Sequence, residues 1–277
     1  MNFSHEFRAS NLQENGELLA AYLQSLPSPM DSYLEDNLDK SQIFSIMASD
    51  THIGFLGVQG ATLWFFYVVK SHTRHAQAIF EEATHKLNVK EVFFQTYDNL
   101  LVSLVMDWEF EKKKGAYFFE DTFHMKRPSL SFANTSFTQA EASDFSFIQQ
   151  ETNNFFDALD LSNGEIFMLH AGDDLLGCGI SVRGRYFTDY TSIGMVTCTR
   201  FRKQGVGKLI LWHLKEWCYE QGLIPIAGCW YYNTLSRKTL ESAGLTPRAR
   251  GMRAILLEKE SIPERTGNPP GEEVTAP

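Results

Sequence analysis

Three cations and two glycines lie between Arg202 and Lys208, and this composition is typical of a turn that binds phosphate. The apolar, β-prone run 190–197 precedes the turn, and apolar residues at helical spacing follow from Leu209 onward, so the glycines stand where a strand turns into a helix. The first N–H groups of a helix lack partners within it and carry partial positive charge, and glycine lets a pyrophosphate approach them. The residues expected to contact it are Arg202, Lys203, Gln204, Gly205, Val206, Gly207 and Lys208.

A glycine pair at such a turn is not specific by itself, because strand-to-helix turns also use glycine for steric reasons. Downstream, a second β-prone run at 224–230 leads into a polar helix start at Asn233 and a helix that ends at Gly244. Together, the two segments resemble the GCN5-related N-acetyltransferase (GNAT) family, in which an arginine-to-glycine pyrophosphate loop precedes an asparagine-led helix that ends in glycine and a large apolar residue. The resemblance covers about the second half of the chain.

The resemblance implies how the cofactor, acetyl-CoA, is held. In the family, the strand before the loop diverges from its neighbour, and its free backbone groups pair with the pantetheine amides. By position, those groups belong here to Met195, Val196 and Thr197. The resemblance also directs Asn233 toward the cofactor arm, and Ser236 shares that face of the helix. Asn233 would cap a helix in any protein, and one side chain can fill both roles. No metal ion is expected.

The catalytic acid and base are not identified by the motifs. The family often places a tyrosine one turn beyond the Ser236 position to protonate the leaving thiolate, but Leu240 stands there in this chain. The remaining weak candidates are Tyr190, Tyr232, Asp189 and Glu165. Tyrosines of this kind belong more often to a core, lone carboxylates are most often exposed, and proton removal through ordered water would need none of the four. Cys198 has an apolar setting, which favours direct attack by an amine over an acyl-cysteine.

The order of predicted elements repeats along the chain, which indicates two α/β domains of the acyl-CoA N-acyltransferase type, each a mixed central sheet flanked by helices. Residues 129–261 form the acetyl-CoA-binding domain, residues 1–128 a degenerate copy, and residues 262–277 a disordered tail. In the first copy, helices are expected at 11–26, 30–38, 74–87 and 99–108, and strands within 42–69, at 92–95 and at 116–119. Gly54, Gly57 and Gly60 are expected between strands.

The repeat also predicts what the first copy has lost. It sets Arg74 against Arg202 and Asp98 against Asn233, whereas Gln77 and Ile79 fall at the two loop glycines. Because side chains there would block the approach of a phosphate, we expect the N-terminal copy to bind no CoA.

The second copy is expected to begin after a linker at 124–136. A helix at 140–156 with a polar start at Thr138 follows, and then a hairpin with strands 165–171 and 175–183. A closing strand is expected at 250–258.

Composition narrows the class of protein. The chain has 277 residues, 43% of them hydrophobic, and a net charge of −9, which argues against nucleic acid as a partner and mildly favours a cationic or neutral acceptor. No apolar run is long enough to span a membrane, and the first residues lack a signal-peptide pattern. The four cysteines lie singly in apolar runs, which indicates free thiols in a reducing, cytoplasmic setting rather than zinc ligands or disulfides.

These observations predict an acetyl-CoA-dependent N-acetyltransferase that moves acetyl directly to an amine of a small molecule or peptide. The alternative is a catalytically weak CoA-binding regulatory protein, which the absent tyrosine favours. A nucleotide-binding module without acyl chemistry is a third reading, but no acidic residue follows the loop at the spacing that a ribose contact needs. The sequence identifies neither the acceptor nor the oligomeric state, nor whether the N-terminal half contributes to the acceptor site.

Overall fold

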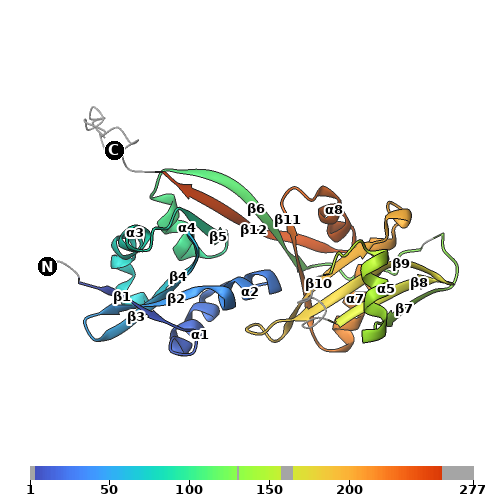
Figure 1. The fold of residues 1–277 in the computed structure, drawn as a ribbon, viewed down its shortest axis with the longest axis horizontal. Helices are drawn as coiled ribbons and strands as arrows, with labels where there is room; N and C mark the ends of the chain where they lie inside the picture. Colours follow the sequence, from blue (N-terminus) through green and yellow to red (C-terminus); the bar gives the residue numbers. More distant parts are fainter. Residues whose placement is uncertain (1–3, 130, 157–164, 258–277) are drawn as a thin grey trace, which may run out of the picture.

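The computed structural model describes residues 4–129, 131–156 and 165–257, so the predicted tail lies outside the described residues. These residues build one mixed sheet in the strand order β1-β2-β3-β4-β5-β12-β6-β11-β10-β9-β8-β7 (Figure 1). The strands are β1 Glu6–Ser10, β2 Gln42–Ala48, β3 Thr51–Gln59, β4 Thr62–Val68, β5 Glu91–Gln95, β6 Phe110–Asp121, β7 Thr135–Gln139, β8 Glu165–Ala171, β9 Asp174–Arg183, β10 Tyr190–Thr197, β11 Ile224–Trp230 and β12 Leu245–Leu256. Two halves with the same order of elements thus share one sheet.

The two halves exchange strands where they meet. β12, the last strand of the C-terminal half, pairs antiparallel with β5 and with β6 of the N-terminal half. β6 in turn pairs antiparallel with β11 of the C-terminal half. In Figure 1 these two long strands run side by side between the halves. Each half therefore completes its sheet with a strand from the other.

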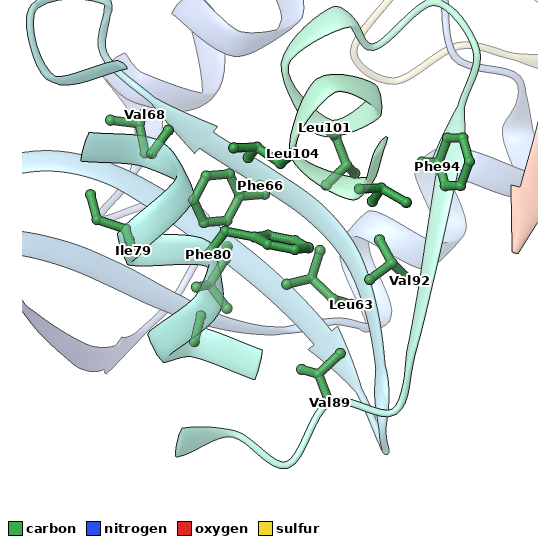
Figure 2. Close-up of a cluster of buried hydrophobic side chains, with 14 of the residues drawn as sticks. Leu63, Phe66, Val68, Ile79, Phe80, Val89, Val92, Phe94, Leu101 and Leu104 are labelled. Atoms are coloured by element: carbon green, nitrogen blue, oxygen red, sulfur yellow. The ribbon is translucent and has the colours of Figure 1, made fainter. Parts of the chain in front are cut away.

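Helices cover both faces of the sheet. They are α1 Gly16–Ser25, α2 Ser32–Lys40, α3 Ala76–Lys86, α4 Asn99–Met106, α5 Phe145–Glu151, α7 Val206–Glu220 and α8 Thr234–Ser242, with short 3₁₀ turns η1 Lys70–His75, η2 Ala142–Asp144 and η3 Thr199–Phe201. Alternating side chains of β5 point to opposite faces: Val92 and Phe94 join the core under α3 and α4 (Figure 2), whereas Phe93 joins the core under α1 and α2. Two further cores lie in the C-terminal half, one under α7 and α8 and one under α5.

Local sequence explains where several elements begin and end. α2, α4 and α8 start after Asp31, Asp98 and Asn233, whose side chains each accept a hydrogen bond from the backbone N–H three residues on. α8 is followed by Gly244 at φ 89°, a left-handed conformation that glycine adopts without strain. The continuous apolar run of β4 predicts a strand buried on both faces, and Leu63–Phe66 are all buried in the structure.

The structure corrects several predicted elements. Gly54 and Gly57 lie inside β3 rather than between strands, and a Cβ atom at Gly54 would come within 2.1 Å of the Tyr67 carbonyl oxygen on β4. Thr138 is in β7, not at a helix start, and the helix expected at 140–156 is reduced to η2 and α5. β7 was not recognised because it is an edge strand with a polar, exposed sequence. β6 and β12 are longer than expected, and β1 was not predicted.

A buried contact holds α2 of the N-terminal half against the loop before β10. The Glu35 side chain is fully buried and accepts hydrogen bonds from the backbone N–H groups of Arg185 (2.8 Å), Tyr186 (3.1 Å) and Phe187 (3.4 Å). The Arg185 guanidinium pairs with Asp36 at 2.7 Å and with Asp39 at 3.0 Å. α2 is therefore fixed to the C-terminal half as well as to its own.

Candidate functional site

β10 and β11 run parallel but pair only at their starts. Tyr190, Thr191 and Ser192 are in register with Ile224, Pro225 and Ile226, and no later pair follows. On its other edge, β10 stays paired with β9 as far as Thr197. Beyond Ser192 the two parallel strands diverge, so the edge of β10 that faces β11 has no strand partner there. The predicted cofactor strand, Met195 to Thr197, lies in this divergent part.

The turn after β10 has an unusual backbone. Lys203 at φ 63° and Gly205 at φ 84° are both left-handed, and Gly205 occupies the N-cap position of α7 without a side-chain cap. Backbone N–H groups that converge in such a turn at a helix N-terminus form a concave site for anions. The residues 202–205 are exposed, and the Arg202 guanidinium is held by a 3.3 Å hydrogen bond from Nε to the Thr197 carbonyl oxygen.

Gly207 lies inside the first turn of α7 and is buried. A Cβ atom on it would lie 3.3 Å from both Met195 Sδ and Thr197 Oγ1. Thr239 of α8 would be closer still, at 3.1 Å from its Cγ2. The absence of a side chain at Gly207 therefore lets the start of α7 approach both β10 and α8. The structure thus gathers β10, the turn and α8, the segments that the motifs single out, around one point.

Asn233 caps α8, as its side-chain oxygen accepts a hydrogen bond from the Ser236 N–H at 3.0 Å. The capping role is confirmed, while contact with a cofactor stays a prediction for Asn233 and Ser236. Lys208 is half-buried in the first turn of α7, and Val206 is buried there.

The weak catalytic candidates are spread around the site. Tyr190 is in the paired start of β10, and Tyr232 is exposed just past the end of β11. Asp189 is exposed and precedes β10; its carbonyl oxygen accepts the Ile224 N–H. Glu165 opens β8, which β9 separates from β10. The structure therefore does not bring these four side chains together.

At the position one turn beyond Ser236, where the family often has a tyrosine, this chain has a buried leucine. Leu240 is only 2% exposed and belongs to the core under α7 and α8. The thiols offer no substitute nucleophile, because burial raises the pKa of Cys198, and raises it to about 12 for Cys178 and Cys218 and to about 11 for Cys229. A thiol is a poor nucleophile when its pKa is this high.

One residue that sequence reasoning missed lies close to the divergence. Asp31 precedes α2, and a Cβ atom on Gly228 of β11 would lie 2.3 Å from its Oδ2. Asp31 is 6% exposed, and burial raises its pKa from 3.8 to about 6. An aspartate before a helix reads as an N-cap in any sequence, so only the tertiary fold reveals its second neighbour.

The N-terminal half has the same strand divergence with a different turn. β4 and β5 pair only at Thr62–Leu63 with Glu91–Val92. A cleft of about 250 Å³ follows, lined among others by Tyr22, Tyr67, Lys70, Asp98 and Leu100.

The helix after β4 in that half starts without a left-handed residue. η1 runs straight into α3, whose N-cap is His75 at φ −103°. The sequence repeat set Gln77 against Gly205. In the structure the residue at the equivalent N-cap position is His75. The predicted register differs by two residues, one because β4 ends at Val68 rather than Val69 and one because the turn before α3 is one residue shorter than the turn before α7. Ile79 is fully buried in the core under α3.

Among the described residues, no group of His, Cys, Asp and Glu side chains is arranged to hold a metal ion. Within the same residues, no helix is long and apolar enough to cross a membrane. The four cysteines are free thiols.

Solved structures similar to this chain show the fold. An acetyltransferase of the GNAT family from Colwellia psychrerythraea matches with a TM-score of 0.82 at 19% identity, covering 92% of this chain and 100% of the other. A tandem GNAT protein from the clavulanic acid biosynthesis pathway matches at 0.60 and 10% identity, covering 91% and 98%. A GCN5-related N-acetyltransferase from Sphaerobacter thermophilus matches at 0.55 and 11% identity, covering 91% and 96%.

Two family models match the sequence itself. The acetyltransferase (GNAT) domain model matches residues 11–122, and the acetyltransferase (GNAT) family model matches residues 131–245. No curated protein matches the chain. The two models and the shared sheet agree in placing one such domain in each half, and the chain therefore belongs to the GCN5-related N-acetyltransferase family.

Proposed function

We propose that the C-terminal half binds acetyl-CoA and transfers its acetyl group directly to an amine of a small molecule or peptide. The observation that supports this most is the continuous path from the free edge of β10 through the left-handed turn to the uncapped start of α7. Such a path offers paired amide contacts at one end and an anion site at the other, as a molecule with a pantetheine arm and a pyrophosphate requires.

The roles follow from this placement. Met195, Val196 and Thr197 would hold the pantetheine amides through their backbone groups. The pyrophosphate would sit on the N–H groups around Gly205 and Gly207, with Arg202, Lys203 and Lys208 supplying positive charge and Gln204 and Val206 completing the turn. Asn233 and Ser236 would line the arm from α8. Bound acetyl-CoA supplies an activated acetyl thioester.

Direct transfer is favoured over an acyl-enzyme because the thiols of the C-terminal half have raised pKa values. An amine that attacks the thioester itself needs only a group to accept its proton and a position next to the carbonyl carbon. We propose a cytoplasmic location on the basis of the free cysteines, which suit a reducing compartment.

A catalytically weak, CoA-binding regulatory protein is the second candidate. The observation that favours it is the burial of Leu240, which leaves no hydroxyl at the position where the family often places its general acid. The two candidates share the cofactor site and differ only in turnover.

Thermal unfolding with ligands, followed by an assay of CoA release, tests both candidates. A ligand that binds only the folded state adds about 2.7 kcal/mol of stability at a hundredfold excess over its Kd, so we expect CoA to raise the midpoint and ATP or NAD to raise it far less. Release of free thiol from acetyl-CoA is then measured with a panel of amines. Equal shifts from all three nucleotides would point to a generic nucleotide module, and binding without release from any amine would favour the regulatory protein.

A further inference from the structure

α2 of the N-terminal half begins beside the point where β10 and β11 separate. The Ser32 N–H donates a 2.8 Å hydrogen bond to Oγ of Ser192, the last residue of β10 that is paired with β11. Because Ser192 is opposite Ile226, Gly228 is level with Gly194, one residue before the proposed pantetheine strand. The carboxylate of Asp31, which lies against Gly228, is therefore next to the position where the thioester would end.

A small cavity lies beside Asp31 where the two halves meet, over residues of β6, β11 and β12. Its volume of about 10 Å³ is close to the least that holds one water molecule, or an amino group of the same size. Its polar lining comes from Asp31, Tyr97 after β5, Glu120 of β6 and Arg248 of β12. The Arg248 and Glu120 side chains are 59% and 32% exposed, and their Nε and Oε2 atoms lie 3.8 Å apart. These two side chains connect the cavity with solvent, and Asp31 lies at its inner end.

The helix cap uses only one oxygen of Asp31. Oδ1 accepts the Leu34 N–H at 3.0 Å, and Oδ2 is the atom that faces Gly228. A Cβ atom at 228 would overlap with Oδ2, so any larger residue there would displace the Asp31 carboxylate from this position. The pairing of a glycine on β11 with a carboxylate that precedes α2 thus brings an acidic oxygen directly onto the face of β11.

Several charged groups act on this carboxyl. Burial raises its pKa to about 6, Glu35 and Asp36 of α2 add repulsion, and the Leu34 N–H lowers the pKa. From the other elements, Glu120, Arg248 and the Tyr97 hydroxyl face the same cavity, and the Tyr97 hydroxyl donates to the Pro29 carbonyl oxygen at 3.3 Å. A carboxylate with a pKa near neutrality accepts a proton more readily than an ordinary aspartate and is still ionised at pH 7.

We infer that Asp31 of the N-terminal half accepts the proton of the acceptor amine for the reaction in the C-terminal half; this rests on the proposed function. The ammonium group of the acceptor enters the cavity and gives one proton to Oδ2, which frees its lone pair. The nitrogen then bonds to the acetyl carbon, the carbon–sulfur bond breaks, and the second N–H proton leaves with the thiol. The cavity has room for the amino group alone, and the rest of the acceptor would extend past Arg248 and Glu120 into solvent.

Asp31→Asn and Asp98→Asn form a matched pair for the test. Both aspartates are buried helix N-caps with a pKa raised to about 6, and asparagine caps as well as aspartate does. Asp98 differs because it lies in the N-terminal cleft, where the Tyr22 hydroxyl donates to its Oδ2 at 2.9 Å. CoA affinity, kcat and KM are measured for the intact chain across pH 5–9, with the amine that gives the fastest CoA release.

For Asp31→Asn we expect unchanged CoA affinity and a loss of kcat/KM of about 10²- to 10⁴-fold, the range for a general base. In the parent, kcat/KM should rise with pH through about 6 as Asp31 ionises. This rise, the acidic limb of the pH profile, should be absent from the profile of Asp31→Asn. Asp98→Asn should keep the parent profile. A change in folding alone would move the thermal midpoint in both variants but would not remove the limb from one of them.

Parental kcat/KM and an intact pH limb in Asp31→Asn would overturn the inference and leave the proposed function standing. No CoA release by the parent with any amine would instead overturn the proposed function. If Asp31→Asn does not fold, Gly228→Ala takes its place, because its methyl group would displace Oδ2 while keeping the aspartate. The expected result is then a similar loss of kcat with CoA still bound, and parental turnover would overturn the inference.

Discussion

Gly205 carries the left-handed turn on which the proposed pyrophosphate site depends. Its counterpart at the other end of α7, Gly222, is also left-handed, at φ 70°, and a Cβ atom there would meet nothing within 4 Å. Alanine costs roughly 1–2 kcal/mol of stability at either position because it resists positive φ. The two glycines therefore share one backbone requirement, and only one of them adjoins the proposed site.

We expect Gly205→Ala to weaken CoA binding by about tenfold or more, which corresponds to about 1.4 kcal/mol. The strain shifts the N–H groups at the start of α7 away from the phosphates. Gly222→Ala should lower the thermal midpoint to a similar degree and bind CoA as the parent does. Titration calorimetry on both variants measures this, and equal affinities would place the anion site elsewhere.

At the scale of single elements, the sequence predicts those whose signals are local. β8 and β11 have the predicted bounds, and the cap at Asn233 and the stop at Gly244 are as expected. The turn at 202–208 could be located because its glycines and cations adjoin one another in the chain. Asp31 could not, since it meets Gly228 only after the two halves pack together.

The first turns of α3 and α7 lead to different expectations for the two halves. Both follow diverging parallel strands, but the turn before α3 lacks the left-handed pair Lys203 and Gly205, and its N-cap is His75. η1 continues directly into α3, so the turn lacks the left-handed conformation that makes backbone N–H groups converge on an anion. A cleft of about 250 Å³ lies near Asp98, but without a left-handed turn beside it we expect no comparable phosphate site there.

We consequently expect one CoA per chain. Calorimetric titration of the intact protein should give a stoichiometry near one, and Gly205→Ala should weaken that same site. Two sites, or a site that Gly205→Ala leaves unaffected, would show that the N-terminal cleft binds CoA. The degenerate-copy hypothesis would then be wrong.

At the scale of the whole molecule, the exchanged strands make the two halves interdependent. Ala254 of β12 belongs to the C-terminal half in sequence, yet it is fully buried in the N-terminal core under α3 and α4. Its partner across the sheet is Lys112 of β6, which is exposed. The proposed division near residue 128 therefore separates sequence repeats but not independent sheets.

We expect a single cooperative unfolding transition, with the calorimetric enthalpy equal to the van't Hoff enthalpy. Ala254→Val should overpack the core, cost about 1–3 kcal/mol, and shift the unfolding of both halves together. Lys112→Ala, at the exposed residue opposite Ala254, should change stability by less than about 0.5 kcal/mol. The chain has five tryptophans, so two variants that each keep a single one, Trp64 or Trp217, report the unfolding of the two halves separately by fluorescence. Separate midpoints would contradict the expectation.

The exchange also orders events while the chain is being made. β5 and β6 leave the ribosome early, but the strand that fills the gap between them, β12, begins only at Leu245, after β6 has ended at Asp121. At about 5–20 residues per second, this interval lasts roughly 6–25 s. During this time, the nascent first half presents unpaired strand edges, which are prone to pair with other chains. Its sheet is completed only when one of the last segments to be synthesised returns to it.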